Sequence, residues 1–356
     1  TEPPFAYARW GNPTTRALEA KLAALEGGEA ALAVATGMAA VSALCFTFLK
    51  SGDHVVASEV CYAGSVELFG LHLPRQGIQV SLVDTSDLAQ VRQALQPHTR
   101  LVYVETPANP VLRISDIQAI AAIAHEAQAL LVVDSTWATP CLQRPLASGA
   151  DYVIHSATKY LGGHHDLLSG VVIGRKELVD PIREHVNMMG AVADPHNAYL
   201  LLRGLKTLGL RVRHQNQVAM QLAEYLLTQP LVEQVYYPGL SNHPDHEIAK
   251  RQMSGFGGVV SFTLRADLEG TARFLDQLQI PYITPSLGGA ESLVSQPALL
   301  SYYSISAGDR AAWGIKDNLV RYALGIEDAE DLIADLQQAF NWLQEQFKGK
   351  EIKIDG

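Results

Sequence analysis

Lys159 is the residue whose type and position most clearly suggest chemistry. The apolar stretch 152–154 precedes it and two glycines follow it, so we expect its ammonium group at the end of a buried strand. A partly desolvated amine loses its proton more easily and can attack an aldehyde to form a Schiff base. Ser156 and Thr158 lie just before the lysine, and their hydroxyls suit the phosphate of the same cofactor. An ordinary strand-end lysine beside a Ser-Ala-Thr turn explains these residues equally well.

A second stretch, residues 130–134, ends in a carboxylate. Its sequence, LLVVD, is typical of a buried parallel strand whose carboxyl end faces a ligand crevice. Asp134 can there pair with a pyridinium nitrogen and keep it protonated, so that the ring works as an electron sink. Capping of a following helix by Asp134 is the competing interpretation, because Ser135 and Thr136 follow. Together, Lys159 and Asp134 point to pyridoxal 5'-phosphate as the cofactor.

The motifs around these residues resemble a known family. SATKYLGGHHD at 156–166 and VDST at 133–136 are similar to the Cys/Met-metabolism family of pyridoxal-phosphate enzymes, which includes cystathionine γ-synthases, cystathionine γ-lyases and methionine γ-lyases. The resemblance extends over nearly the whole chain. Stretches similar to plant-type cystathionine γ-synthases lie at 237–240, 254–258, 280–289 and 301–303. The implied fold is α/β and fold-type I, with a mostly parallel seven-stranded sheet covered by helices and a smaller α+β C-terminal domain.

The resemblance implies four further cofactor contacts in the first half of the chain. Gly37 and Met38, at a strand-turn-helix junction, would supply backbone amides to the phosphate, which fits the affinity of helix N-termini for anions. Tyr62 would stack on the pyridine ring and assist proton transfer. Asn109 would donate to the phenolic oxygen of the cofactor and contact the substrate. Packing of the tyrosine and an Asn-Pro turn are the alternative roles.

Two C-terminal segments are implied to bind the substrate. Ser286 would position the lysine, and with Leu287 it would line the substrate site. Arg321 lies in an apolar strand, where a guanidinium needs an anion, and the resemblance assigns it to the substrate α-carboxylate. Pairing with Glu327 or Asp328 is the alternative.

The N-terminal arm, residues 1–12, carries Tyr7 and Arg9 on one face if it is extended. A hydroxyl and a guanidinium can clamp a phosphate, although such an aromatic arm often only packs. The resemblance implies that the arm binds the cofactor phosphate of a neighbouring subunit. We therefore expect a homodimer that completes the active site, and a homotetramer built from such dimers.

Strand and helix patterns alternate along the sequence around these side chains. This alternation predicts a mostly parallel sheet with helices on both faces. We expect a cofactor-binding large domain at 13–205 and a small domain at 206–356, joined by one long helical region at 197–227. The remaining expected strands are 54–57, 78–83, 101–105 and 258–264, and the remaining expected helices are 14–25, 88–95, 268–278 and 328–347.

Composition narrows the class of protein. The 356 residues are 48% hydrophobic and 18% charged, with a net charge of −10, which disfavours nucleic acid and acidic membranes as partners. Three cysteines without a CxxC motif and no membrane-length apolar run indicate the cytoplasm. His164, His165 and Asp166 do not predict a metal site, since adjacent side chains diverge. The chain begins at Thr1 without Met, so an upstream segment is expected to be missing.

The predicted reaction is γ-replacement: an O-activated homoserine exchanges its leaving group for cysteine or another thiol. The alternative is γ-elimination, as in cystathionine or methionine γ-lyases, giving 2-oxobutyrate, ammonia and a thiol. Pro285, where γ-lyases usually carry a glutamate, favours the synthase. The run Ala63-Gly64-Ser65 lacks the basic residues of plant-type synthases, which disfavours a phosphorylated substrate and favours a lyase or an acyl-homoserine user. A non-catalytic binding protein is a rival that retention of Lys159 disfavours.

Overall fold

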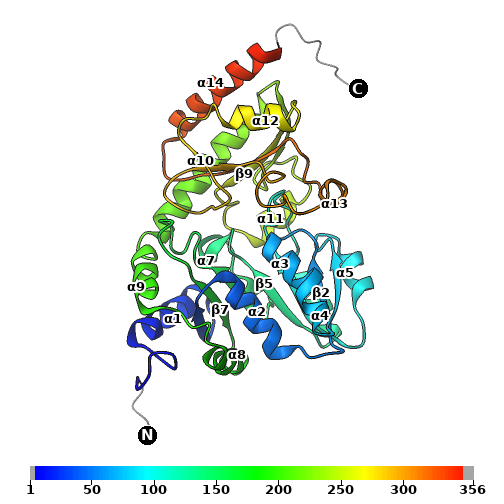
Figure 1. The fold of residues 1–356 in the computed structure, drawn as a ribbon, viewed down its shortest axis with the longest axis vertical. Coiled ribbons are helices and arrows are strands. Elements are labelled where there is room, and N and C mark those ends of the chain that lie inside the picture. Colours follow the sequence, from blue (N-terminus) through cyan, green and yellow to red (C-terminus); the bar gives the residue numbers. More distant parts are fainter. Residues whose placement is uncertain (1–4, 348–356) are drawn as a thin grey trace.

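The computed structural model describes residues 5–347 and contains two β-sheets. In Figure 1 the larger sheet and its helices form the lower part of the molecule and the smaller sheet the upper part. The larger sheet has seven strands, and only β7 runs antiparallel to its neighbours. The predicted mostly parallel α/β sheet is thus confirmed. In spatial order its strands are β1 (Ala30–Val34), β7 (Gly170–Gly174), β6 (Tyr152–Ser156), β5 (Leu130–Asp134), β4 (Thr99–Glu105), β2 (His54–Ser58) and β3 (Gln79–Val83).

Helices cover both faces of this sheet, because successive strand residues point to opposite sides. Val55 packs in the same core as residues of α2 and α8, whereas Val56 packs in the core shared with α5 and α6. Val132 and Val133 repeat this alternation one strand further on. The helices of this part are α1 (Pro13–Glu26), α2 (Gly37–Phe48), α3 (Ala63–Glu67), the π-helical turn Leu68–His72, α4 (Leu73–Arg75), α5 (Leu88–Ala94), α6 (Ile117–Glu126), α7 (Thr139–Leu142), the 3₁₀ turn Pro145–Ser148 and α8 (Lys176–Met189).

The first helix shows how local sequence sets an element's bounds. The Asn12 side chain accepts a hydrogen bond from the Thr14 amide at 2.9 Å, and Pro13 occupies the first helical position. Gly27 ends the helix with φ of 76°, a left-handed conformation that glycine adopts without steric cost.

The C-terminal sheet has five strands and is mainly antiparallel. Its strands, in spatial order, are β10 (Tyr282–Ile283), β11 (Leu293–Ser295), β12 (Leu319–Ala323), β9 (Val259–Leu264) and β8 (Val232–Tyr236). Helices α10 and α14 pack together beside it (Figure 1). The remaining helices are α9 (Pro195–Gly204), α10 (Leu208–Leu227), α11 (His246–Gln252), α12 (Leu268–Leu275), α13 (Ala307–Ala312) and α14 (Ala329–Phe347).

The helical region predicted at 197–227 consists of two helices, α9 and α10, with a short break between them. The chain leaves helical geometry after Gly204 because the Arg211 side chain takes backbone acceptors there: Nη2 donates to Gly204 O and Nη1 to Tyr160 O, both at 2.9 Å. The segment also fits closely against the lysine loop, since a Cβ on Gly204 would lie 2.1 Å from Gly162 O. The break therefore fixes the connecting helices to the segment that carries Lys159. The predicted domain boundary at residue 205 stays a prediction.

Among the residues described, none of the helices has the length and apolarity needed to cross a bilayer.

Candidate active site

Lys159 lies three residues beyond the end of β6, in a loop that faces the C-terminal sheet. Its Nζ donates to Ser286 Oγ at 2.9 Å, which joins the two halves of the molecule. Burial, aided by the nearby Arg321 charge, lowers the pKa of the Lys159 amine from 10.5 to about 8. About a tenth of this amine is therefore unprotonated at pH 7, far more than for a lysine of ordinary pKa, and only this form attacks an aldehyde.

Asp134 ends β5 and is 8% exposed. One carboxylate oxygen accepts from the Thr136 amide at 3.0 Å and the Thr136 hydroxyl at 2.5 Å, and the other accepts from Tyr103 Oη at 3.2 Å. The alternative of helix capping is wrong for α7, which begins at Thr139 and is preceded by Ala138 without a side-chain cap. Burial raises the pKa of Asp134, so this carboxylate is suited to a cationic partner such as a protonated pyridine nitrogen.

The residues predicted to hold the cofactor phosphate lie where α2 begins. The amides of Gly37 and Met38 make no hydrogen bond within residues 5–347, because the Thr36 side chain caps Ala39 instead. Gly37 lies against Ser156: an added Cβ would be 2.9 Å from Ser156 Oγ. A phosphate would fit here, because two free amides, the positive end of a twelve-residue helix and a hydroxyl lie together.

The Thr158 hydroxyl is already engaged. It donates to Ser169 O at 3.2 Å and accepts from the Ser169 amide at 3.1 Å, so it must rotate before it can donate to a phosphate. Its role in binding stays a prediction.

Glu105 is a site residue that the sequence reasoning missed. It ends β4 beside Asp134, and its two carboxylate oxygens accept from the backbone amides of Tyr62 at 2.8 Å and Asn109 at 3.0 Å. Burial and the Asp134 charge raise the pKa of Glu105 to about 8. One buried carboxyl therefore holds both the loop of Tyr62, whose side chain is 51% exposed, and the loop of Asn109.

Tyr302 was also missed, although it lies in the Ser-Tyr-Tyr stretch noted above. Its side chain is fully buried, and its hydroxyl lies 2.8 Å from Cys61 O and 2.9 Å from Asn109 O. It also accepts from Asn109 Nδ2 at 3.3 Å. Tyr302 thus ties the C-terminal part of the chain to the loops that present Tyr62 and Asn109.

Arg321, on β12, is 3% exposed and forms no ion pair with any carboxylate of residues 5–347. Its Nη1 donates to Asn109 Oδ1 at 3.1 Å, its Nη2 donates to Ser286 O at 3.0 Å and Pro285 O at 2.5 Å, and its Nε has no partner. Burial lowers its pKa to about 10. A buried guanidinium that lacks a carboxylate is suited to an anionic ligand.

The alternative pairing of Arg321 with Glu327 is wrong. The Glu327 carboxylate instead accepts from the backbone amide and hydroxyl of Ser292, each at 2.7 Å. Leu287 lies beside the site, but its side chain packs in the hydrophobic core with Leu161, so a contact with substrate would come from its backbone.

Tyr7 and Arg9 do not lie with the other predicted residues. The Tyr7 side chain is 54% exposed, and Arg9 lies 5.2 Å from the centre of its ring and donates to the backbone of Asn187 in α8. Residues 5–12 of this arm lie at the end of the molecule opposite α14 (Figure 1), and residues 1–4 are outside the described part of the chain. Within one chain, then, the Arg9 side chain is engaged by α8 and not by the residues around Lys159.

The histidines after the lysine have other partners. His164 Nδ1 donates to Gly162 O at 2.9 Å, and His165 Nδ1 lies 3.4 Å from Glu291. In the part of the chain that the structure covers, His, Cys, Asp and Glu side chains form no cluster of three that could hold a metal ion.

Comparison with known proteins agrees with this geometry. The sequence matches the family described as Cys/Met metabolism PLP-dependent enzyme over residues 1–341. It is 48% identical over 338 residues to cystathionine γ-synthase 1 of Nicotiana tabacum, covering 95% of this chain and 63% of that protein. It is 46% identical over 337 residues to the L-methionine γ-lyase of Fusobacterium nucleatum subsp. polymorphum, covering 94% and 85%.

A solved structure has a similar fold. The cystathionine γ-lyase of Lactobacillus plantarum, complexed with L-serine, superposes with a TM-score of 0.93 at 40% identity, covering 96% of this chain and 90% of that one. The chain spans only 63% of the length of the Nicotiana tabacum synthase and 60% of the length of cystathionine γ-synthase 1 of Arabidopsis thaliana. The family match over residues 1–341, these similarities and the arrangement around Lys159 together show that this chain belongs to the Cys/Met metabolism family of PLP-dependent enzymes.

Proposed function

We propose that the protein catalyses γ-replacement on an O-acyl homoserine, with cysteine or another thiol as the incoming nucleophile. The observation that carries this proposal is the convergence of an amine of lowered pKa, Lys159, with a buried arginine that has no carboxylate partner, Arg321. The two are joined through Ser286, which contacts both. Such a pair can hold an amino acid by its carboxylate while a base reaches the adjacent carbons.

Each residue then has a defined task. Arg321 grips the α-carboxylate, and Asn109, held by Arg321 and Glu105, fixes the orientation of the substrate. Pyridoxal phosphate bound between Asp134 and the start of α2 supplies an electron sink for negative charge at the α carbon. Lys159 moves protons at the α and β carbons, and the Ser286 hydroxyl keeps its amine directed toward the substrate.

The choice of replacement over elimination rests on Pro285. At this position the protein has no side-chain carboxylate, and the backbone carbonyl accepts from Arg321 at 2.5 Å. The similarity to plant synthases at 280–289 supports the same choice. The start of α3, Ala63-Gly64-Ser65, carries no cation, which favours an acyl over a phosphoryl leaving group.

γ-Elimination is the second candidate. It is favoured by the same uncharged run after Tyr62 and by the 46% identity to the Fusobacterium methionine γ-lyase and to the cystathionine γ-lyase of Bacillus subtilis. It would use the same residues, without a thiol entering.

The test is incubation of the protein with O-succinyl-, O-acetyl- or O-phosphohomoserine, each with cysteine, followed by mass spectrometry of the products. We expect a thioether from an acyl ester and little from the phosphate ester. Accumulation of 2-oxobutyrate without thioether would establish elimination instead.

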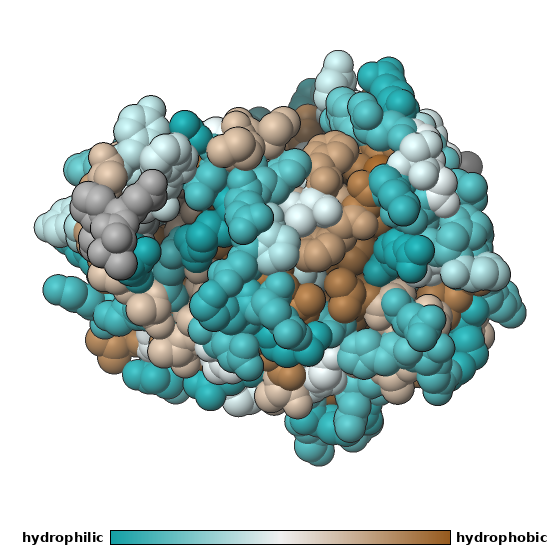
Figure 2. Space-filling view, turned by 90° about the horizontal axis from the view of Figure 1, so that it is seen from below, coloured by the Kyte–Doolittle hydropathy of each residue, from teal (hydrophilic) through white to brown (hydrophobic). Residues whose placement is uncertain are grey.

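We further propose a homodimer in which Tyr7 and Arg9 of one chain bind the cofactor phosphate of the other, with two dimers forming a tetramer. Figure 2 views this lower end of the molecule and shows an apolar patch near the middle of the face. Exposed apolar side chains on α8 and α9 include Met188 (73%), Met189 (72%) and Tyr199 (57%).

Complementation tests this dimer. Arg9→Ala and Lys159→Ala should each be inactive alone, while an equimolar mixture after subunit exchange should recover about a quarter of the activity, because half the chains enter mixed dimers and each mixed dimer has one intact site. No recovery in a mixture that light scattering shows to be dimeric would contradict it.

Residence in the cytoplasm stays a prediction.

A further inference from the structure

A cavity of about 310 Å³ lies between the ends of β2 and β3 and strand β8 of the C-terminal sheet. None of Lys159, Asp134 and Arg321 lines it, so it is distinct from the site described above. Its size suits a small organic molecule. The lining residues that carry charge, hydrogen-bonding groups or aromatic rings include Glu59, Asp84, Arg113, Tyr236, His243 and Trp313.

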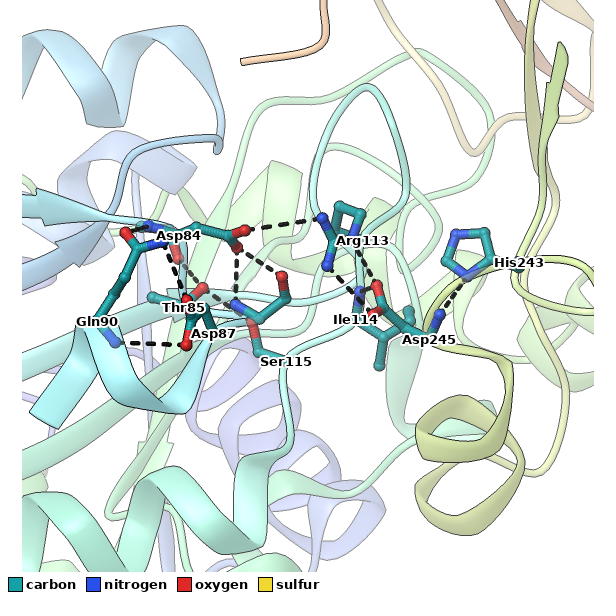
Figure 3. Close-up of polar contacts among 11 residues, drawn as sticks. Asp84, Thr85, Asp87, Gln90, Arg113, Ile114, Ser115, His243 and Asp245 are labelled. Atoms are coloured by element: carbon teal, nitrogen blue, oxygen red, sulfur yellow. Dashed lines mark hydrogen bonds and ion pairs between the residues drawn. The ribbon is translucent and has the colours of Figure 1, made fainter. Parts of the chain in front are cut away.

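One side of the cavity presents hydrogen-bond donors. Arg113 is anchored by Asp245, to which its Nε and Nη2 donate at 2.7 and 3.2 Å. Its remaining nitrogen, Nη1, makes no hydrogen bond within residues 5–347 and lies 3.7 Å from Asp84 Oδ2 (Figure 3). The guanidinium is thus held rigidly with one end still available to a ligand.

His243 lines the cavity beside Arg113 as a neutral ring. It is 6% exposed, and its Nδ1 accepts from the Asp245 amide at 3.1 Å, so in the neutral ring the proton is on Nε2. Burial lowers the pKa of His243 to about 4, which keeps the ring neutral at pH 7, and the Leu112 carbonyl faces the Nε2 proton. Arg113 is therefore the cation among the lining residues.

Carboxylate acceptors lie beside the Arg113 guanidinium. The half-buried Glu59 carboxylate makes no hydrogen bond or ion pair among the described residues, and its pKa is raised by burial and by the charge of Asp84. Asp84 uses Oδ1 to accept from the amide and hydroxyl of Ser86, leaving Oδ2 near Arg113. Two carboxylates share this side, and Asp245 already balances the Arg113 charge, so the cavity favours a cationic group.

We propose that this cavity binds a free α-amino acid. The ligand ammonium lies between Glu59 and Asp84, and its carboxylate accepts from Arg113 Nη1. The zwitterion matches a wall in which donors and acceptors lie side by side, as the 3.7 Å separation of Arg113 and Asp84 shows. A simple carboxylate would be repelled by the two acidic residues, and a simple amine would leave Arg113 Nη1 without a hydrogen-bond acceptor. Val60, Val111 and Trp313 offer apolar contact to the ligand side chain.

The test uses three probes with one carbon skeleton: L-norleucine, hexanoate, which lacks its amine, and pentylamine, which lacks its carboxylate. Holoenzyme is first reduced with borohydride, so that its cofactor cannot form an imine with an added amine. Isothermal titration calorimetry should show L-norleucine binding at one site per chain, at least about tenfold tighter than either analogue. Equal binding of hexanoate or pentylamine, or no binding of L-norleucine, overturns the proposal.

Variants locate the site. Glu59→Gln and Asp84→Asn should each weaken L-norleucine binding about tenfold or more, because each removes a charge from the ammonium position. The matched control Glu177→Gln changes a carboxylate that is 70% exposed on α8 and should bind as the parent does. Arg321→Lys should also retain binding, since Arg321 does not line the cavity. Unchanged affinity in folded Glu59→Gln and Asp84→Asn, or loss in Arg321→Lys, places the ligand elsewhere.

Discussion

Two arginines at the junction of the two sheets are held in opposite ways. Arg321 is buried and bonded only to neutral oxygens, those of Asn109, Pro285 and Ser286. Arg113 is 37% exposed at its side chain and has a nearly buried carboxylate, Asp245, as its partner. A cation with a carboxylate partner contributes to stability even where one nitrogen stays open to a ligand, as in Arg113, whereas Arg321, which forms no ion pair, has its whole charge available to a substrate carboxylate.

The surroundings of the two residues differ accordingly. Asp245 also accepts from the Ile114 amide at 2.9 Å, so the Arg113 pair holds the loop after β4 against the C-terminal half of the chain. Arg321 instead contributes to the lowered pKa of Lys159, because a like charge disfavours the protonated amine. Arg321 thus contributes to the reactivity of Lys159, in addition to its proposed role in binding the substrate carboxylate.

The largest expected effect is on the reactive side of this comparison. Lys159→Ala removes the amine that we propose bonds the cofactor and moves protons, and we expect kcat/KM to fall by at least about 10⁴-fold. Mass spectrometry after borohydride treatment should find the cofactor adduct on Lys159 in the parent and none in the variant. An adduct on another lysine would contradict the assignment.

Arg321→Lys tests whether the uncompensated arginine serves the substrate. The ammonium cannot make the bidentate grip of a guanidinium, so we expect kcat/KM to fall about 100-fold. The thermal midpoint should change little, because no carboxylate loses its partner. Arg92→Lys, at an exposed ion pair with Glu126, is the matched control and should be unaffected in both assays. Unimpaired turnover in Arg321→Lys would show that another group binds the carboxylate.

Arg113→Met tests the compensated arginine and should have the reverse profile. It leaves the Asp245 carboxylate, 6% exposed, with one backbone donor, and we expect a loss of about 2–3 kcal/mol in the free energy of unfolding. Arg92→Met, which breaks a pair exposed on both sides, should cost under about 0.5 kcal/mol. Equal stability losses in chemical denaturation would refute the contrast between the two pairs.

The lowered pKa of Lys159 gives a pH dependence with a definite sign. Only the unprotonated amine attacks the aldehyde, so the rate of covalent attachment to cofactor-free protein should fall about tenfold per pH unit below about 8 and level off above it. Stopped-flow absorbance between pH 6 and 9.5 measures this. A rate still rising steeply at pH 9.5 would mean an amine with its ordinary pKa.

Ser286→Ala is expected to have the smallest effect. It removes the hydroxyl that accepts from Lys159 Nζ, a single hydrogen bond of about 1 kcal/mol, so kcat should fall several-fold while KM stays nearly unchanged. Ser304→Ala, on an exposed part of a nearby loop, serves as the control. A loss as large as that of Lys159→Ala would make Ser286 itself a proton-transfer group.

Much of the catalytic half could be predicted from local sequence. The apolar runs before Asp134 and Lys159 fix two neighbouring strands, and parallel strands end at the same edge of a sheet, so the two side chains had to face one crevice. The helix at 14–25 was predicted within one residue at each end, because its proline and flanking residues act within one turn. The roles of Tyr62 and Ser286 came from family resemblance rather than from such patterns.

Other contacts could not be predicted because they join residues far apart in the chain. The sequence predicted Glu105 only as the end of a strand, yet its carboxyl group accepts hydrogen bonds from the loops that carry Tyr62 and Asn109. The Arg113–Asp245 pair spans 132 positions, and Arg211 ends α9 by bonding to a carbonyl that no local rule assigns to it.

Local sequence patterns set the order of strands and helices and the chemistry at the strand ends, since periodicity and turn residues act over a few positions. Which charges are compensated depends on contacts between distant parts of the chain. Arg321 forms no ion pair with Glu327, whereas Arg113 is paired with Asp245. Burial and the choice of partner depend on how the two sheets pack together.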